Sequence, residues 1–244
     1  MTPRVNPPHH DIPAVILAGG LGTRLQPIVR DRPKALAPVR SRPFLAYLLD
    51  WLERANFTRV ILCVGHLAEQ IKETFGDTYA TLALTYSYEP EPRGTAGALR
   101  LALNQIDDEL CLVLNGDSFV DADLTAFLDW HRQHIFAGSI LLTHVDNTAR
   151  FGLVETGNNG SISAFLEKQE THRAGYINAG VYLLSRQLLE SIPHDLKVSI
   201  EHECFPQWLS LGLGGYRTQA RFIDIGTPES LHQAEAFFAS YHTS

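Results

Sequence analysis

The sequence is poor in the residues that mark several classes of protein. Its three cysteines, Cys63, Cys111 and Cys204, lie far apart and form no C-x-x-C pair, so neither a disulfide framework nor a zinc finger is predicted. No stretch approaches the roughly 18 apolar residues of a membrane-spanning helix. Residues 1–10 also lack the apolar run of a signal peptide. These absences predict reduced thiols, a cytoplasmic location and no membrane partner.

Basic residues are also in the minority. The chain has 20 Lys and Arg against 27 Asp and Glu, which gives a formal net charge of −7. Because a nucleic-acid-binding surface is strongly basic, this balance argues against a nucleic-acid partner. The other proportions, 45% hydrophobic and 19% charged over 244 residues, are those of an ordinary globular protein. We expect a flexible N-terminal tail at residues 1–12 and a single domain at residues 13–244.

Short apolar segments alternate with longer amphipathic ones in the first half of the chain. This alternation is typical of an α/β sheet with parallel strands and crossover helices. Strands are expected at residues 13–18, 59–64, 84–88, 110–114, 139–145, 152–155, 162–167, 176–185 and 220–224. Helices are expected at residues 43–55, 94–104 and 199–211. A last helix is expected after Thr227, with Thr227 as its N-cap and Pro228 as its first helical residue. The closely spaced strands after residue 138 are expected to extend the sheet and to form a lid over the carboxyl ends of its strands.

A glycine-rich turn follows the first expected strand. The segment L-A-G-G-L-G-T-R-L occupies residues 17–25 and allows the backbone to pass close to a ligand and direct N–H groups at it, as phosphate sites require. A simple tight turn is the alternative. A dinucleotide fingerprint would need Gly or Ala where Leu25 stands, and a Walker loop needs a Gly-Lys pair, which the sequence lacks.

Basic residues follow this turn. Arg24, Arg30, Arg32 and Lys34 lie within a few positions of it, and Pro33 stiffens the approach to Lys34. Such a cluster is able to offset the charge of a triphosphate. A solvated charge run on the surface is the alternative interpretation.

Eight segments in register resemble the sugar nucleotidyltransferases. After L-A-G-G-L-G-T-R-L come R-P-K-A-L-A-P-V, E-P-E-P-R-G-T-A-G-A, L-N-G-D-S-F, R-F-G, F-L-E-K, I-N-A-G-V-Y and F-I-D-I-G-T-P, in the order of that family. The resemblance runs from Pro13 to about Ala236. It implies a Rossmann-like three-layer α/β/α sandwich with a mixed, mainly parallel sheet, of the nucleotide-diphospho-sugar transferase type. It also implies an enzyme that joins a nucleoside triphosphate to a sugar 1-phosphate and releases pyrophosphate.

Within that family, the segments N-G-D-S-F and F-I-D-I-G-T-P are most similar to members that transfer a guanylyl group to D-glycero-α-D-manno-heptose 1-phosphate. Mannose, glucose and N-acetylmuramic acid 1-phosphates remain alternatives for the sugar, and UTP and dTTP for the nucleotide. A nucleotide-sugar sensor without turnover is the alternative from another functional class.

The reaction brings two anions together, so charge neutralisation and alignment dominate its chemistry. Mg²⁺ is the expected cofactor, because it is held by one or two carboxylates together with phosphates. Asp117 and Asp224 each follow an expected strand, and the resemblance makes both of them metal ligands. A turn or N-cap role is the alternative for each. Asp121 and Asp123 match no ligand position and are expected to be a turn residue and a cap.

The resemblance also implies the other site residues, which fall into three groups. The catalytic residues are Arg24, Lys34, Asp117 and Lys168. The nucleotide-binding residues are Leu17, Gly19, Gly20, Gly22, Thr23, Arg24, Lys34, Glu89, Gly94, Thr95, Asn115 and Asp117. The sugar-phosphate-binding residues are Gly152, Glu167, Lys168, Asn178 and Asp224. A surface ion pair is the alternative for Glu167 and Lys168, and a structural hydrogen bond is the alternative for Asn178.

Glu89 bears on the identity of the base. Guanine offers two adjacent donors that one carboxylate can accept, whereas uracil and thymine offer one donor between acceptors, so Glu89 favours GTP. The alternative is that Glu89 points to solvent and that backbone groups of Gly94 bind the base. Arg93 stands where the family usually has Leu, and Ala96 where it usually has Gly, so the sequence departs from the family pattern in this segment.

Two further patterns have structural interpretations. His131 and His134 lie three apart on an expected helix but bring no further metal ligands, so they are predicted to be surface histidines, as are those of the His9-His10-Asp11 segment. Cys63 and His66 are expected to have packing roles. An apolar face on residues 199–211 leaves a homo-oligomer open as an alternative to burial within the domain.

Overall fold

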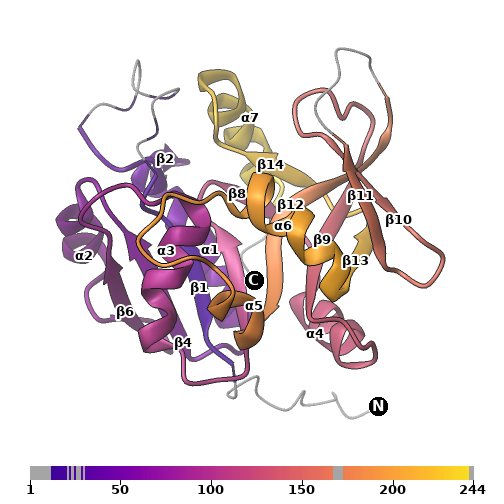
Figure 1. Cartoon of the computed structure of the whole chain (residues 1–244). Helices are drawn as coiled ribbons and strands as arrows, with labels where there is room; N and C mark the ends of the chain where they lie inside the picture. The colour runs from indigo at the N-terminus through magenta and orange to yellow at the C-terminus, as the bar shows by residue number, and fades with distance from the viewer. Residues whose placement is uncertain are drawn as a thin grey trace, which may run out of the picture.

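The computed structural model describes residues 12–20, 22, 25, 29, 31–166 and 173–241. Its central feature is an eight-stranded sheet in the order β13-β9-β12-β7-β1-β4-β6-β5 (Figure 1). The strands are β1 (Ala14–Leu17), β4 (Arg59–Val64), β5 (Thr78–Tyr79), β6 (Leu82–Tyr88), β7 (Leu110–Asn115), β9 (Gly138–Val145), β12 (Gly175–Ser185) and β13 (Leu213–Thr218).

The strand directions make this a mixed, mainly parallel sheet, which confirms the expected fold class. β1 is parallel to both of its neighbours, β4 and β7, and β4 is parallel to β6. β12 is antiparallel to β7 and β9, β5 is antiparallel to β6, and β13 and β9 are parallel. The central strands are continuous apolar runs because helices cover both of their faces.

Two hydrophobic clusters fill the space between the sheet and its helices. Side chains alternate along β1, so Ala14 and Ile16 belong to one cluster and Val15 to the other. The helices are α1 (Phe44–Arg54), α2 (Ala68–Phe75), α3 (Gly94–Ala102), α4 (Leu124–Arg132), α5 (Arg186–Glu190), α6 (Phe205–Trp208) and α7 (Pro228–Ala239). α1, α2, α4 and α7 contribute to the first cluster, and α3, α5 and α6 to the second.

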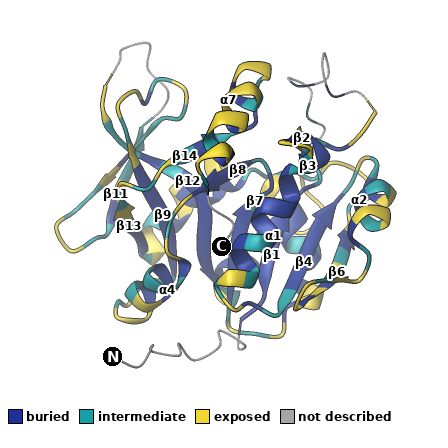
Figure 2. Cartoon of the chain, turned by 180° about the vertical axis from the view of Figure 1, so that it is seen from behind, coloured by how far each residue is buried: buried dark blue, intermediate teal, exposed yellow. Residues whose placement is uncertain are grey.

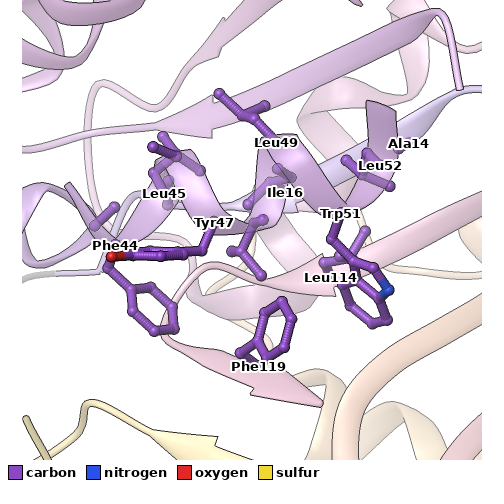
Figure 3. Close-up of a cluster of buried hydrophobic side chains, with 14 of the residues drawn as sticks. Ala14, Ile16, Phe44, Leu45, Tyr47, Leu49, Trp51, Leu52, Leu114 and Phe119 are labelled. Carbon is purple, nitrogen blue, oxygen red and sulfur yellow. The ribbon is translucent and has the colours of Figure 1, made fainter. Parts of the chain in front are cut away.

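The first cluster is centred on α1. Figure 3 shows the side chains of this helix gathered against Ile16 and Leu114 of the sheet and against Phe119. The ring centroids of Trp51 and Phe119 lie 5.1 Å apart. Figure 2 shows the central strands buried and the exposed residues on the outer faces of the helices, which is the three-layer arrangement that the sequence predicted.

Three two-stranded sheets accompany the central one. They pair β2 (Pro38–Val39) with β3 (Arg42–Pro43), β10 (Leu153–Thr156) with β11 (Ile162–Leu166), and β8 (Ser118–Val120) with β14 (Phe222–Asp224). The last expected strand therefore lies in a ribbon with β8, outside the central sheet. This ribbon brings Asp224 opposite Ser118, next to the end of β7.

The expected strands and the first two helices lie within two residues of their predicted bounds. Residues 199–211 are helical but irregular: a π-helical turn at Ile200–Cys204, then α6, then a 3₁₀ turn at Leu209–Leu211. Thr227 caps α7 as predicted, with its side chain accepting from the N–H of Ser230. No helix in the described part of the chain has the length and apolar character needed to cross a membrane.

Candidate active site

Four parallel strands end at the same edge of the sheet, and polar or glycine residues follow each of them. The register places Leu17 beside both Cys63 and Asn115, so the loops after β1, β4 and β7 leave the sheet together. Glu89 follows β6, and its N–H donates to the carbonyl of Val64 at 2.8 Å. In open α/β sheets, ligands bind at this carboxyl edge.

A pocket of about 750 Å³ lies at this edge, within the usual range for a small-molecule site. Residues of the loops after β1, β6 and β7, of the β10–β11 hairpin and of the β8–β14 ribbon line it. The hairpin contributes Leu153, Val154, Phe165 and Leu166, so the second group of strands does provide a wall beside the carboxyl ends.

Most of the site residues expected from the sequence line this one pocket. They are Leu17, Gly19, Gly20, Gly22, Glu89, Gly94, Thr95, Asn115, Asp117, Gly152, Asn178 and Asp224. Lys34 joins them through an ion pair with Asp117. Thr23, Arg24, Arg30, Glu167 and Lys168 lie outside the described residues, as do His9, His10 and Asp11.

The two aspartates proposed as metal ligands are neighbours in space. Asp117 follows β7, and its carbonyl accepts from the N–H of Ile225 at 2.8 Å, one residue after Asp224. Each carboxylate has a cationic partner: Lys34 Nζ lies 2.6 Å from Asp117 Oδ2, and Arg150 Nη2 lies 3.0 Å from Asp224 Oδ2. The second oxygen of Asp224 accepts from the N–H of Gly226 and from the hydroxyl of Ser230. The pocket therefore contains two adjacent, balanced ion pairs.

These carboxylates fit a magnesium ion by the chemistry of their donors. Both offer oxygen to the same pocket, and no cluster of three or more His, Cys, Asp or Glu side chains is present in the residues that the structure describes. Mg²⁺ takes one or two carboxylates with phosphate and water oxygens, whereas a zinc site needs three or four protein ligands. Asp117 and Asp224 are the residues that would hold it.

Glu89 lies at the opposite end of the pocket, against the glycine turn. A Cβ atom on Gly19 would lie 3.3 Å from Glu89 Oε1, and Glu89 Oε2 accepts from the N–H of Arg93 at 2.9 Å. Burial raises the pKa of Glu89 from its usual value, and the N–H of Arg93 opposes that shift. Glu89 is partly buried and lines the pocket.

The N-terminal turn of α3 is fixed to the segment after residue 196. The N–H of Ala96 donates to the carbonyl of Val198, and the N–H of Ile200 donates to the hydroxyl of Thr95. Gly94 has a φ of +74°, and a Cβ atom there would lie 2.4 Å from the carbonyl oxygen of Val198, so only glycine permits this approach. Lys197, Ser199 and Glu201 of this segment also line the pocket.

A hydrogen-bonded network around Tyr182 forms the remaining wall. The hydroxyl of this buried residue accepts from the side-chain amides of Asn115 and Asn178, at 3.3 and 3.0 Å, and donates to Glu201 Oε1 at 3.4 Å. Burial, and then the nearby Glu201 carboxylate, raise the pKa of Tyr182 well above its usual value, so it stays a donor. Asn178 also donates to Glu201 and accepts from the N–H of Gly180.

Asn178 lines the pocket, but its hydrogen bonds in the structure are to protein groups. These are the structural hydrogen bonds that the sequence offered as the alternative to a sugar contact. Sequence reasoning missed Glu201, which lines the pocket, and Tyr182, which lies buried behind that wall. Arg150 belongs to the family-like segment R-F-G, but the sequence predicted no role for it. The R-F-G segment could have indicated Arg150, because Arg150 stands two residues before Gly152. The segment I-E-H-E-C-F-P gave no such indication for Glu201, because its charges look like those on the solvated face of a helix.

The two residues that depart from the family pattern, Arg93 and Ala96, have side chains that do not line the pocket. The guanidinium of Arg93 pairs with Asp195 at 2.6 Å and lines a separate cavity of about 240 Å³. Ala96 is fully buried in the second hydrophobic cluster. Neither side chain is among those lining the larger pocket.

His131 corrects one expectation. It is not a surface residue: it is 8% exposed, and its Nδ1 lies 2.7 Å from the hydroxyl of Ser139. Its helix packs against the sheet, so this position faces inward, and burial lowers the pKa of His131. Asp123 caps α4 as expected, whereas Asp121 is not in a turn and pairs with Arg221 instead.

The cysteines are all free and buried. Burial raises the pKa of Cys63, that of Cys111 to about 12 and that of Cys204 to about 11. Their thiols are therefore poor nucleophiles at neutral pH. Cys63 has the packing role that the sequence predicted, whereas His66 is exposed and does not.

A sheet of this order with a polar pocket at its carboxyl edge defines a class, the Rossmann-like nucleotide-diphospho-sugar transferase fold. Among solved structures, HddC from Yersinia pseudotuberculosis complexed with GMP-PN has a TM-score of 0.83 to this chain, with 32% identity over 93% of this chain and 99% of that one. The sequence then identifies the family within the fold. The model of the Nucleotidyl transferase family matches residues 13–240, and the chain belongs to that family.

Two curated relatives differ in how much of their own length this chain covers. A mannose-1-phosphate guanylyltransferase of Mycobacterium tuberculosis is 35% identical over 231 residues, which are 93% of this chain and 64% of that protein. A D-glycero-α-D-manno-heptose 1-phosphate guanylyltransferase of Aneurinibacillus thermoaerophilus is 33% identical over 229 residues, 93% of this chain and 99% of that protein. The chain thus spans less than two thirds of the first relative and nearly all of the second.

Proposed function

We propose that the chain transfers the guanylyl group of GTP to D-glycero-α-D-manno-heptose 1-phosphate. A phosphate oxygen of the sugar 1-phosphate attacks the α-phosphorus of GTP and forms a new phosphorus–oxygen bond. The bond from the α-phosphorus to the bridging oxygen breaks, and pyrophosphate leaves with that electron pair. No proton transfer is needed, because the attacking phosphate is already an anion near neutral pH.

The observation that carries this proposal is the arrangement of acidic groups along one pocket. Glu89 lies beside the glycine turn at one end, and Asp117 and Asp224 lie side by side at the other, each next to a cation. A base with two adjacent donors fits the first end, and phosphates bound through a metal ion fit the second. The relatives that act on mannose and heptose 1-phosphates support a guanylyl donor.

The nucleotide is held by backbone groups and by Glu89. The glycine turn at residues 19–22 directs N–H groups at the triphosphate, and the base lies between this turn and the start of α3. Glu89 Oε1 accepts from the guanine edge while Oε2 stays bonded to the N–H of Arg93. Thr23 and Arg24, which the sequence assigns to the triphosphate, complete this subsite.

Asp117 and Asp224 hold Mg²⁺, which when bound reduces the repulsion between the two substrates. Lys34 is 12% exposed and pairs with Asp117. It is also close to Asp224, because both side chains lie near Gly226: a Cβ atom on that glycine would lie 2.7 Å from Asp224 Oδ1 and 3.8 Å from Lys34 Nζ. Its ammonium stabilises the charge that develops on the phosphate oxygens.

The sugar 1-phosphate occupies the end of the pocket formed by Gly152, Asn178 and Asp224. Glu167 accepts from sugar hydroxyl groups, and Lys168 binds the sugar phosphate. The amide of Asn178 is oriented by Tyr182 and Glu201, so the contact it offers to a hydroxyl is fixed in direction.

Pyrophosphate release from a panel of nucleoside triphosphates and sugar 1-phosphates tests this proposal. We expect the fastest release with GTP and the heptose 1-phosphate in the presence of Mg²⁺. Faster release with UTP or dTTP would overturn the assignment of the base, and a preference for glucose or N-acetylmuramic acid 1-phosphate would overturn that of the sugar. Release from no pair would favour a nucleotide-sugar sensor.

Mannose 1-phosphate is the second candidate for the sugar. The relative from M. tuberculosis is as similar to this chain as the heptose enzyme is. The heptose remains the first candidate because the chain spans 99% of the heptose enzyme and only 64% of the mannose enzyme. The ratio of kcat/KM for the two sugar phosphates with GTP decides between them.

A further inference from the structure

Arg150 is a pocket residue whose present partner is also a proposed metal ligand. It lies in the loop between β9 and β10, two residues before Gly152, and its Nη2 donates to Asp224 Oδ2 at 3.0 Å and to Oδ1 at 3.2 Å. Its guanidinium also lies over the ring of Phe151, 5.1 Å from the centroid. Phe151 in turn packs edge-on against Phe222, on the same strand as Asp224.

The two oxygens of Asp224 differ in their partners. Oδ1 accepts from the N–H of Gly226 at 2.8 Å and from the hydroxyl of Ser230 at 3.2 Å, and both contacts come from its own loop and from α7. For Oδ2, Arg150 is the donor found among the described residues. Oδ2 is therefore the oxygen available to a metal ion, provided that Arg150 leaves it.

Charge counting shows why Arg150 would leave. Asp117 and Asp224 carry two negative charges, and Lys34 and Arg150 balance them. A divalent cation held by these carboxylates would add two positive charges, so both ion pairs would be weakened and Lys34 and Arg150 would need other anions. The triphosphate and the sugar phosphate supply such anions in the proposed reaction.

The position of Arg150 indicates which anion it takes. The side chain is 48% exposed, so it can turn without disrupting the core. It stands beside Gly152 and Asp224, which line the part of the pocket that the proposed function gives to the sugar phosphate. A guanidinium binds a phosphate through paired N–H donors, which makes arginine well suited to this role.

We propose that Arg150 alternates between two anions: it pairs with Asp224 in the absence of substrates, and it binds the phosphate of the sugar 1-phosphate when Asp224 ligates the metal ion. This inference rests on the proposed function for the identity of the second anion. The first half, competition between Arg150 and a metal ion for Asp224, depends only on the contacts in the pocket.

Binding of Mn²⁺ to the full chain without nucleotide tests the first half, with free Mn²⁺ measured by electron paramagnetic resonance. Removing a competing cation should strengthen binding, so we expect Arg150→Ala to bind Mn²⁺ about fivefold more tightly than the wild-type chain. The gain should disappear when Asp224→Asn is added to Arg150→Ala. Equal binding by the wild-type and Arg150→Ala chains, or measurable binding by neither, overturns the inference.

Steady-state kinetics test the second half. Arg150→Ala is expected to raise the KM for the sugar 1-phosphate about tenfold or more and to leave the KM for GTP within about twofold, with Arg150→Lys in between. An unchanged KM for the sugar 1-phosphate overturns the inference even if Mn²⁺ binding is tighter. A wild-type chain that turns over no substrate pair refutes the proposed function, while the Mn²⁺ titration still reports on Arg150 and Asp224.

Arg221→Ala is the matched control. Arg221 is exposed to a similar extent, pairs with Asp121 at 3.0 Å and stacks over the ring of Phe237, but it does not line the pocket. It should change neither Mn²⁺ binding nor the KM for the sugar 1-phosphate. If Arg221→Ala reproduces the effects of Arg150→Ala, a general change in surface charge explains them and the inference is wrong.

Discussion

The two ends of the pocket are made in different ways. At the end near β1 and β6, the lining is rich in glycines from loops that follow parallel strands, with Glu89 as an acidic side chain among them. At the end near Asp224, the lining is made of side chains from separate segments, including Arg150, Asn178 and Glu201. These side chains are bonded to one another or to their neighbours before any ligand binds.

The difference has a chemical consequence. The backbone end offers N–H groups that need no rearrangement, and we therefore expect it to bind the nucleotide, with the triphosphate extending from the glycine turn towards the two aspartates. The side-chain end consists of ion pairs and a Tyr182 network, and a ligand must replace or extend those contacts. Selectivity for the sugar is thus expected to depend on side chains, and binding of phosphates to depend on charge.

Asp117 lies beside Asp224 at the side-chain end, and its substitution should have the largest effect. Asp117→Asn removes one charge from the metal site and leaves Lys34 without its carboxylate, so we expect turnover to fall by about 10²-fold or more. The measurement is kcat for pyrophosphate release at saturating Mg²⁺. Asp121→Asn, an equal change outside the pocket, is the control, and similar activity of the two variants would remove Asp117 from the mechanism.

Glu89→Gln should have the next largest effect, and it should be confined to the backbone end. An amide can accept one of the two guanine donors but opposes the other with its own N–H groups. We expect the preference for GTP over UTP to fall by about 10- to 100-fold, the value of a hydrogen bond to a charged group. The ratio of kcat/KM for the two nucleotides measures it, with Glu91→Gln in the same loop as the control; an unchanged ratio would contradict the role of Glu89.

Glu201→Gln should have a smaller effect, at the side-chain end. It weakens the acceptor that orients both Tyr182 and Asn178, so the KM for the sugar 1-phosphate should rise about fivefold to tenfold. The KM for GTP should hardly change, which distinguishes positioning from a general loss of structure. Glu203→Gln is the control, because Glu203 accepts from the N–H of Ser199 in the same turn but does not line the pocket. A rise in both KM values would show that Glu201 supports the whole fold.

The same contrast explains what could be predicted from the sequence. The glycine turn, Glu89 and Asp117 each follow a strand with a strong apolar pattern, so their placement at one edge follows from the parallel sheet. Arg150 and Glu201 lie in segments that follow strands or turns. The placement of those segments depends on antiparallel pairing between strands that are far apart in the sequence. Sequence patterns give the elements there, but not which of their charged residues face inward.

The fold shows a similar division. The central strands and α1 lie where their apolar periodicity predicts them, whereas α2 and β13 lie outside the elements expected from the sequence. β13 contains Gly214 and Gly215, which favour a turn. In the structure a Cβ atom on Gly214 would lie 2.4 Å from the ring of Phe136, so glycine is needed for close packing within a strand.

The smallest expected effect concerns the stability of the backbone end as a function of pH. Burial raises the pKa of Glu89, so ionisation of this residue is less favourable in the folded chain than in the unfolded one. The wild-type chain therefore loses some stability as the pH rises from about 4.5 through the raised pKa of Glu89. The Glu89→Gln chain keeps this stability, because glutamine does not ionise. We expect the Tm of Glu89→Gln relative to wild type to be higher at about pH 7.5 than at about pH 4, by about 1–2 °C, because Glu89 is only half-buried. Thermal melts of both chains at the two pH values measure the difference, and Glu91→Gln controls for the loss of a charge from the same loop. A relative Tm that falls with rising pH would mean that the N–H of Arg93 outweighs burial, and that Glu89 is a better anchor for its own loop than an acceptor for a base.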